Sequence, residues 1–134
     1  MLTNIDRQKN IPALQKYRIL VADDDPAILD ALKMMLEICD YDVDTESDGK
    51  VVAKLKKTRP QLLLLDIWMS GTDGREVCKK LKSQAETRDI PVILISASRD
   101  IEKSFKESGA NDYLAKPFEI DELLNKIEKN LAVN

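Results

Sequence analysis

The sequence has 134 residues, of which 43% are hydrophobic and 34% are charged, and its formal net charge is −3. A chain of this length and composition can form one domain with a sizeable core, without a metal or a disulfide as a staple. The slight acidic excess gives no sign of a basic surface, so we expect no direct contact with nucleic acid. Because the chain has no histidine, it cannot use Ser-His or Cys-His nucleophilic catalysis or build a histidine-containing zinc site. Any chemistry must rest on carboxylates, hydroxyls and lysines.

No part of the sequence has the pattern of a secretion signal or a membrane span. The first ten residues, MLTNIDRQKN, contain no apolar core, and no run of 18 apolar residues occurs. Cys39 and Cys78 each lie in a stretch with helical apolar spacing and have no ligand-type partner nearby in the sequence. We therefore expect two buried thiols, a reducing compartment, a cytoplasmic location and no membrane partner.

The first half of the chain alternates between strand and helix patterns. Residues 1–16 are polar and contain Pro12, so we expect a flexible arm there and a domain over residues 17–134. The predicted elements are then a strand over Arg18–Ala22, a helix that begins at Pro26, a strand over Tyr41–Glu46 and a helix over Asp48–Lys57. The apolar residues of the first helix recur every three or four positions and are expected to face the core: Ile28, Leu32, Met35, Leu36 and Cys39.

The second half continues this alternation. Gln61–Leu65 brings four consecutive leucines, which is typical of a central parallel strand covered on both faces. The next predicted elements are a helix over Gly74–Gln84, a strand over Pro91–Ser96, a helix around Ile101 and Phe105 that ends at Gly109, a strand over Asp112–Ala115 and a helix from about Ile120 to Leu131. Five strands alternating with five helices predict a doubly wound α/β fold. We expect a five-stranded parallel sheet in the flavodoxin-like order 2-1-3-4-5, with helices on both faces and the site outside the carboxyl ends of the strands.

Reactive side chains follow four of the five predicted strands. They are Asp23, Asp24 and Asp25 after the first strand, Asp66 after the third, Ser96 at the end of the fourth and Lys116 after the fifth. The first and third strands are neighbours in the expected order, so their carboxylates should converge and require a compensating cation. A hard divalent ion such as Mg²⁺ suits oxygen ligands of this kind. The alternative, that these acids are helix caps and solvated loop residues, is sufficient for Asp25 but explains poorly why an acid also ends the central strand.

A carboxylate beside a metal can act as a nucleophile toward phosphorus. Asp66 emerges from the buried leucine run and is the candidate for this role, while Ser96 and Lys116 could bind phosphoryl oxygens.

Four strings in this order and spacing resemble the receiver domains of two-component response regulators: ILVADDD, LLLLDIWMSGTDG, VILISA and GANDYLAKPFEIDEL. The resemblance covers roughly Tyr17 to Leu131. It implies a phosphoacceptor switch that uses Mg²⁺ and takes its phosphoryl group from a phosphohistidine. The implied roles are Asp66 as phosphoacceptor, Asp24 as direct metal ligand, Asp23 acting mostly through water, the Trp68 main-chain carbonyl as a further ligand, Ser96 and Tyr113 as switch residues, and Lys116 as the phosphate-binding lysine. It also implies a cis peptide bond between Lys116 and Pro117, and a signal carried by the surface of the fourth helix, fifth strand and fifth helix.

The sequence departs from the family pattern at two positions. Ser70 stands where the family usually has proline, which suggests a more mobile loop after the third strand. Trp68 is bulky for its position, and we hypothesise that its indole restricts the water that would hydrolyse the acyl phosphate. An exposed aromatic on a partner-binding loop is an equally good interpretation of Trp68.

The absence of histidine means that the phosphohistidine donor must be another protein, either a histidine kinase or a phosphotransfer protein. Docking of the donor is expected to use the first helix and the loop after the fifth strand. Further expected partners are a downstream effector protein or output domain, and a second copy in a phosphorylation-dependent homodimer. Only three residues follow Leu131, so we expect no output domain here, in a single-domain regulator or a piece of a larger protein.

Three other functions compete with this interpretation. A flavodoxin-type electron carrier would need a Ser/Thr/Gly-rich phosphate loop after the first strand, where this chain has three aspartates. An aspartyl-nucleophile phosphatase would turn over phosphate esters, whereas we expect a stoichiometric phosphoacceptor that is not an enzyme in the ordinary sense. The last alternative is an inactive receiver-like scaffold, which is disfavoured because every matched acid, hydroxyl and lysine is present.

Overall fold

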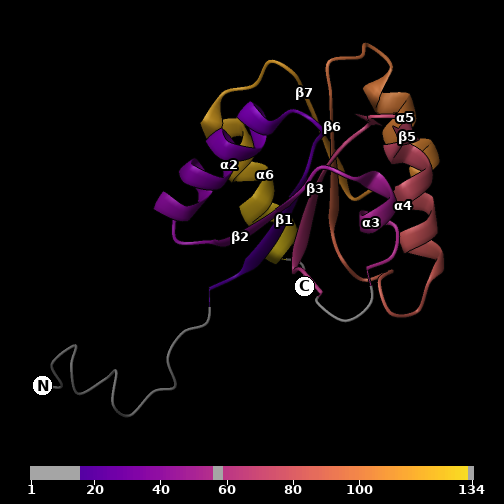
Figure 1. Cartoon of the computed structure of the whole chain (residues 1–134), viewed down its shortest axis with the longest axis horizontal. Helices are drawn as coiled ribbons and strands as arrows, with labels where there is room; N and C mark the ends of the chain where they lie inside the picture. Colours follow the sequence, from indigo (N-terminus) through magenta and orange to yellow (C-terminus); the bar gives the residue numbers. More distant parts are fainter. Residues whose placement is uncertain (1–15, 56–58, 133–134) are drawn as a thin grey trace, which may run out of the picture.

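Five parallel strands form the centre of the computed structural model, which describes residues 16–55 and 59–132 (Figure 1). Their bounds are Arg18–Ala22 for β1, Asp42–Glu46 for β2, Leu62–Asp66 for β3, Val92–Ser96 for β6 and Asp112–Ala115 for β7. The order across the sheet is β2-β1-β3-β6-β7, and each neighbouring pair is parallel. The flavodoxin-like order predicted from the sequence is therefore confirmed. Nearly all of the expected arm lies outside the described residues. The helix expected over Asp48–Lys57 is shorter than predicted, because it spans Gly49–Val52 and the backbone leaves it at Ala53; residues 56–58 lie outside the described residues.

Helices cover both faces of this sheet. Their bounds are Pro26–Ile38 for α2, Gly49–Val52 for α3, Gly74–Ser83 for α4, Ile101–Ser108 for α5 and Ile120–Ala132 for α6. Figure 1 shows α2 and α6 on one side of the sheet and α3, α4 and α5 on the other. Within the described ranges, no helix has the length and apolar character needed to cross a membrane.

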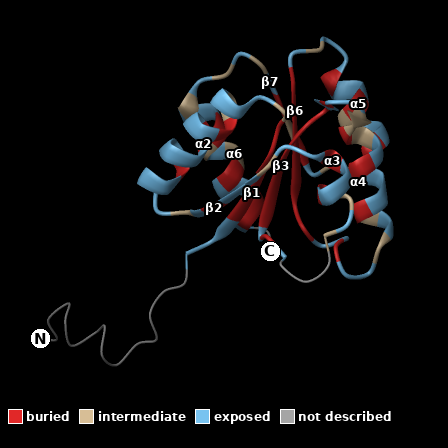
Figure 2. Cartoon of the chain, viewed as in Figure 1, coloured by how far each residue is buried: buried red, intermediate tan, exposed pale blue. Residues whose placement is uncertain are grey.

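Two separate layers of apolar side chains hold the helices on the sheet. Strands β3 and β6 are buried along their whole length, as expected for central strands with helices on both faces (Figure 2). Because side chains alternate along a strand, Leu62 and Leu64 pack toward α2 and α6, while Leu63 and Leu65 pack toward α3, α4 and α5. The leucine run thus supplies both cores from one strand.

The apolar face of α2 differs from the predicted one. Leu29, Leu32 and Leu36 are buried, whereas Met35 and Cys39 are exposed. The helix ends at Ile38, and Cys39 is the residue at which the backbone leaves it. The prediction of a buried Cys39 thiol is therefore wrong, because the chain turns away from the core before that position. The prediction for Cys78 is confirmed, since this residue of α4 is fully buried between the helix and the sheet.

Aspartate side chains cap the N-terminal ends of three of the helices. Asp25, Asp48 and Asp73 each accept a hydrogen bond from the backbone N–H two residues later, at the starts of α2, α3 and α4. The role of Asp25 as a helix cap is thereby confirmed. Gly109 ends α5 with φ of 81°, the left-handed conformation that glycine adopts readily.

A short antiparallel hairpin follows the central strand and was not predicted. It consists of β4, Trp68–Met69, and β5, Thr72–Asp73. Helix α4 begins directly after it at Gly74, where a Cβ would collide with the carbonyl oxygen of Asp66. Glycine at this position therefore lets the start of α4 approach the end of β3 closely.

Candidate functional site

Three carboxylates meet at the carboxyl edge of the sheet. Asp23 and Asp24 follow β1, and Asp66 is the last residue of β3, the strand paired with β1. One oxygen from each of the three lies within 4.8 Å of the others. The convergence expected from the strand order is present, and it brings together three like charges of which Asp23 and Asp66 are buried.

Among the described residues, Lys116 forms ion pairs with two members of this acid cluster, which we define as Asp23, Asp24 and Asp66. Its Nζ lies 3.1 Å from Oδ2 of Asp23 and 3.7 Å from Oδ1 of Asp66. The backbone of Lys116 is fixed by an N–H that donates to the Ser96 carbonyl, and its peptide bond to Pro117 is cis, as the family resemblance implied. One cation shared between two of three carboxylates leaves the cluster with an excess of negative charge.

Burial and charge repulsion act together on Asp66. Burial, followed by the nearby Asp23 carboxylate, raises the pKa of Asp66 to about 6, although Lys116 opposes the shift. The ionised form is therefore less stable here than in water. A bound cation would favour the ionised form, which is the form that can attack an electrophile.

Asp24 lies in a different environment from that of its neighbour. Its Oδ2 accepts two hydrogen bonds of 2.9 Å, from the backbone N–H and from the hydroxyl of Ser70. These bonds lower the pKa of Asp24, the backbone one more than the hydroxyl one. Asp24 is thus held ionised and oriented by the β4–β5 hairpin. The mobility of this loop suggested by the missing proline stays a prediction, although both hydrogen bonds oppose it.

The two candidate switch residues lie on neighbouring strands beyond Asp66. Ser96 is buried at the end of β6, and its Oγ accepts the N–H of Ser98 at 3.0 Å. Tyr113 lies in β7 and is half-buried, with its ring centroid 5.1 Å from that of Phe105 in α5. Lys126 of α6 approaches the same ring from another element, 5.4 Å from its centroid.

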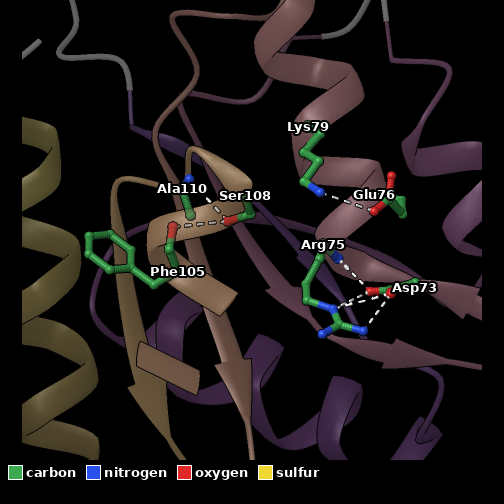
Figure 3. A network of polar contacts seen from close by, with 7 residues as sticks. All are labelled: Asp73, Arg75, Glu76, Lys79, Phe105, Ser108 and Ala110. Atoms are coloured by element: carbon green, nitrogen blue, oxygen red, sulfur yellow. Dashed lines mark hydrogen bonds and ion pairs between the residues drawn. The ribbon is translucent and has the colours of Figure 1, made fainter. Parts of the chain in front are cut away.

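Trp68 lies on the surface beside the acid cluster. Its side chain is 59% exposed, and the Arg75 guanidinium lies 5.1 Å from its ring centroid. Figure 3 shows the same guanidinium donating to both oxygens of Asp73, through Nε to Oδ1 and through Nη2 to Oδ2. Neither interpretation of Trp68 is decided by this arrangement.

Reasoning from the sequence missed two residues around the site. Ser70 was noted only as a replacement for proline, and its bonds to Asp24 join positions 46 residues apart. Lys126 donates to the buried Asp112 carboxylate at 2.9 Å, beside Tyr113. The departure from proline was the only signal for Ser70, and nothing in the sequence pattern pointed to Lys126.

The residues of the acid cluster fit a hard divalent cation. Three carboxylates offer oxygen ligands in one place, and the chain has no histidine that would favour a softer metal. Mg²⁺ is bound in this manner, by a few carboxylates together with water.

The chain is similar to known proteins over most of its length. Residues 19–128 match the model of the response regulator receiver domain. The chain is 41% identical over 113 residues to the DNA-binding dual master transcriptional regulator RpaA of Synechocystis sp., covering 82% of this chain and 47% of that protein. It is 36% identical over 113 residues to the response regulator MprA of Mycobacterium leprae, covering 82% of this chain and 49% of that protein. The chain thus spans about half the length of these curated relatives.

Solved structures of a response regulator and of a receiver domain are also similar to this chain. The response regulator TrrA of Thermotoga maritima, in complex with Mg²⁺ and BeF, superposes with a TM-score of 0.77 at 33% identity, covering 85% of this chain and 98% of that one. The receiver domain of the sensor histidine kinase PA1611 of Pseudomonas aeruginosa has magnesium in its active-site cleft. It superposes with a TM-score of 0.80 at 27% identity, covering 88% of this chain and 99% of that one. With the family model matched over most of its length, this chain belongs to the receiver domains of two-component response regulators.

Proposed function

We propose that Asp66 is the phosphoacceptor of this receiver domain and that the acid cluster binds Mg²⁺. The observation that carries the proposal is the meeting of Asp23, Asp24 and Asp66 within 4.8 Å of one another, with Lys116 beside them. The Mg²⁺ ligands would be Asp24, Asp66 and the main-chain carbonyl of Trp68, with Asp23 acting mostly through water. The magnesium found in the PA1611 and TrrA structures supports this choice of ion.

The proposed reaction is a transfer of one phosphoryl group. A carboxylate oxygen of Asp66 attacks phosphorus and forms an acyl phosphate, while the P–N bond of a phosphohistidine breaks. The electron pair of that bond returns to the imidazole nitrogen, which takes up a proton. When bound, Mg²⁺ would offset the negative charge on the phosphoryl oxygens.

Lys116 and Ser96 would hold the transferred group. Lys116 lies 3.7 Å from Asp66 and can pair with a phosphoryl oxygen. Ser96 follows directly after Ile95, the residue that is in register with Asp66, and its hydroxyl can donate to another oxygen. Lys116 and Ser96 would then interact with the negatively charged phosphoryl oxygens, which are present only after phosphorylation of Asp66.

Phosphorylation would change the conformation of residues in β6 and β7. Movement of the Ser96 hydroxyl toward the phosphoryl group would free space beneath α5, and Tyr113 would rotate into it. Tyr113 packs on Phe105 of α5 and lies beneath Lys126 of α6, so its rotation would change the surface formed by α5, β7 and α6.

The partners follow from the same chemistry. The donor would be a histidine kinase or a histidine phosphotransfer protein, and the receiver of the signal would be an effector protein or an output domain. The name of RpaA describes it as DNA-binding, so an output domain that binds DNA is one candidate, as is a phosphorylation-dependent homodimer. We propose a stoichiometric acceptor rather than an enzyme with turnover, and the cytoplasmic location stays a prediction.

The test is phosphorylation by acetyl phosphate, read by intact mass. We expect the wild type to gain one phosphoryl group in the presence of Mg²⁺ and little or none after chelation. Asp66→Asn should gain none, whereas Asp44→Asn, at an exposed acid on β2, should behave as the wild type. Equal modification of Asp66→Asn and the wild type would refute the assignment of the phosphoacceptor. Steady release of phosphate without accumulation of the modified form would favour the phosphatase alternative.

A further inference from the structure

The hairpin that follows β3 has a tight two-residue turn. Trp68 is in register with Asp73, and Met69 with Thr72, so only Ser70 and Gly71 connect the strands. Both turn residues have positive φ, 32° for Ser70 and 82° for Gly71. Positive φ at both central positions characterises the turn type that best matches the twist of a short hairpin. The hairpin thus presents Ser70 at its tip.

Several contacts fix the hairpin to the rest of the domain. The Met69 side chain is buried, with 1% of its surface exposed. Thr72 packs so closely on Gly49 that a Cβ there would lie 2.6 Å from its Cγ2. Arg75 contacts both residues of one pair in this hairpin. Its guanidinium lies over the Trp68 ring, and it also donates to the Asp73 carboxylate, as Figure 3 shows. The tip of the hairpin is therefore supported by packing on both of its strands.

Ser70 connects this supported tip to the acid cluster. Its N–H and its hydroxyl both donate to Oδ2 of Asp24, each at 2.9 Å. Because two donors from one residue converge on one oxygen, they restrict both the position and the orientation of the carboxylate. Ser70 is also two residues from Trp68, whose main-chain carbonyl is a proposed ligand of the same ion.

We infer that Ser70 is a positioning residue for the cation: it holds Asp24 in register with the hairpin that carries the Trp68 carbonyl, which strengthens Mg²⁺ binding and favours Mg²⁺ over Ca²⁺. The inference rests on the proposed function, in which Asp24 is a metal ligand. Partners of metal-ligating groups commonly contribute about 10- to 100-fold to metal affinity by fixing ligand orientation. Mg²⁺ requires nearly ideal octahedral geometry, whereas Ca²⁺ accepts flexible and irregular ligand sets. A fixed Asp24 should therefore benefit Mg²⁺ more than Ca²⁺.

The residue that the family usually has at this position could not perform this role. Proline has no backbone N–H to donate, has no hydroxyl, and its ring restricts φ to about −65°. Residue 70 has φ of 32°, so proline would require a different turn. Serine in place of proline thus adds two donors to Asp24.

Two substitutions separate the contributions of the donors. Ser70→Gly removes the hydroxyl, keeps the backbone N–H and tolerates positive φ. Ser70→Pro removes both donors. Ser83→Ala is the matched control, because Ser83 is an exposed serine at the end of α4 whose hydroxyl also makes one local bond, to the Lys80 carbonyl at 2.7 Å.

The measurement is calorimetric titration of the full chain with Mg²⁺ and, separately, with Ca²⁺. We expect Ser70→Gly to weaken Mg²⁺ binding by about tenfold and Ca²⁺ binding clearly less, so that the ratio of the two Kd values changes. Ser70→Pro should show at least the same loss, and Ser83→Ala should match the wild type for both ions. Thermal unfolding without added cation shows whether each variant is folded, and Ser70→Gly decides the outcome if Ser70→Pro does not fold.

Three results would overturn the inference. Mg²⁺ affinity of Ser70→Gly within twofold of the wild type would show that the hydroxyl does not matter. Tighter Mg²⁺ binding would show that Ser70 competes with the ion, and equal losses for both cations would indicate a merely structural role. If the wild type itself neither binds Mg²⁺ nor accepts a phosphoryl group, the proposed function fails as well, and this outcome is distinct from the other three.

Discussion

The ammonium of Lys116 lies 3.1 Å from the carboxylate of Asp23, although the two residues are 93 positions apart. The same Nζ is 3.7 Å from Asp66. Without a divalent ion, Lys116 is therefore the counter-ion of two members of the acid cluster. A lysine that already faces these carboxylates is in position to contact a phosphoryl group on Asp66.

Removing the charge of Lys116 should affect metal binding and phosphorylation in opposite directions. In Lys116→Met, one positive charge no longer opposes the incoming cation, so we expect Mg²⁺ to bind about three- to tenfold more tightly. Phosphorylation by acetyl phosphate at saturating Mg²⁺ should nevertheless become slower, because a phosphoryl oxygen loses its partner. Calorimetry and intact mass measure the two effects. Lys80→Met, at an exposed position on α4, is the control, and weaker Mg²⁺ binding by Lys116→Met would contradict this account.

The raised pKa of Asp66 predicts a fold that is stabilised when this carboxylate is neutralised. The pKa of the folded state is about 6, against an ordinary value of 3.8, so the contribution of Asp66 to stability is greatest below pH 4 and is lost as the pH rises through 6. Asp66→Asn should therefore be more stable than the wild type by about 1 to 2 kcal/mol at pH 7.5 without metal.

This stability difference should depend on pH and on Mg²⁺. It should largely disappear at pH 3, below both the ordinary pKa of 3.8 and the folded value of about 6, where the wild-type carboxyl is mostly protonated in the folded and the unfolded states. Added Mg²⁺ should reverse it at pH 7.5, because only the wild type retains all three carboxylates. Urea unfolding under the three conditions measures the effect. A variant that is less stable than the wild type at pH 7.5 without metal would be the contrary result.

The two interpretations of Trp68 make different predictions for one substitution. If the indole restricts attack by water on the acyl phosphate, Trp68→Asn should lose its phosphoryl group faster, and about fivefold corresponds to roughly 1 kcal/mol in the barrier. Trp68→Phe, which keeps an aromatic ring, should lie closer to the wild type. The measurement is the decay of the phosphorylated form after removal of the donor.

Equal decay rates for Trp68→Asn and the wild type would remove the water-restriction hypothesis. The partner-binding interpretation would then predict slower phosphoryl transfer from a protein donor, with unchanged transfer from acetyl phosphate. The side chain is 59% exposed, which makes such a contact accessible.

The buried carboxylate of Asp112, next to the proposed switch residue Tyr113, should contribute to the free energy of unfolding in a pH-dependent way. Although burial opposes the effect, hydrogen bonds from Lys126 and Asn130 hold the pKa of Asp112 below its ordinary value. Its contribution is therefore present above the ordinary pKa near 3.8 and is lost as the pH falls through the lower folded value. In Lys126→Met the carboxylate loses a charged partner, and we expect a loss of about 1 to 3 kcal/mol at pH 7.

Urea unfolding of Lys126→Met at pH 7 and at pH 3 tests this expectation, with Lys129→Met on the same helix as the control. The difference from the wild type should shrink at the lower pH. A constant difference at both pH values would mean that Lys126 stabilises the fold through packing on Tyr113 rather than through its charge.

The sequence predicted the strands and the strand-end residues well, for a physical reason. Continuous apolar runs such as Leu62–Leu65 must be buried on both faces, and parallel strands bring the residues after them to one edge. Asp23, Asp24 and Asp66 are consequently found together, as expected. Local periodicity and topology were sufficient for this part of the site.

Contacts between loops could not be predicted in the same way. The hydrogen bonds of Ser70 to Asp24 depend on a turn with positive φ at two positions, which leaves no periodic signal. The exposure of Cys39 depends on where α2 ends, and apolar spacing locates helix ends only within a few residues. Both features are set by tertiary structure.

The separation of the apolar interior into two layers has a consequence for how such a protein can diversify. The layer beneath α2 and α6 and the layer beneath α3, α4 and α5 share the sheet but draw on alternate residues of it. A substitution that reshapes one flank is therefore largely insulated from the other. Residues of α5 can therefore vary without repacking the layer beneath α2, the helix expected to dock the donor, whereas α6 shares that layer and is constrained together with α2.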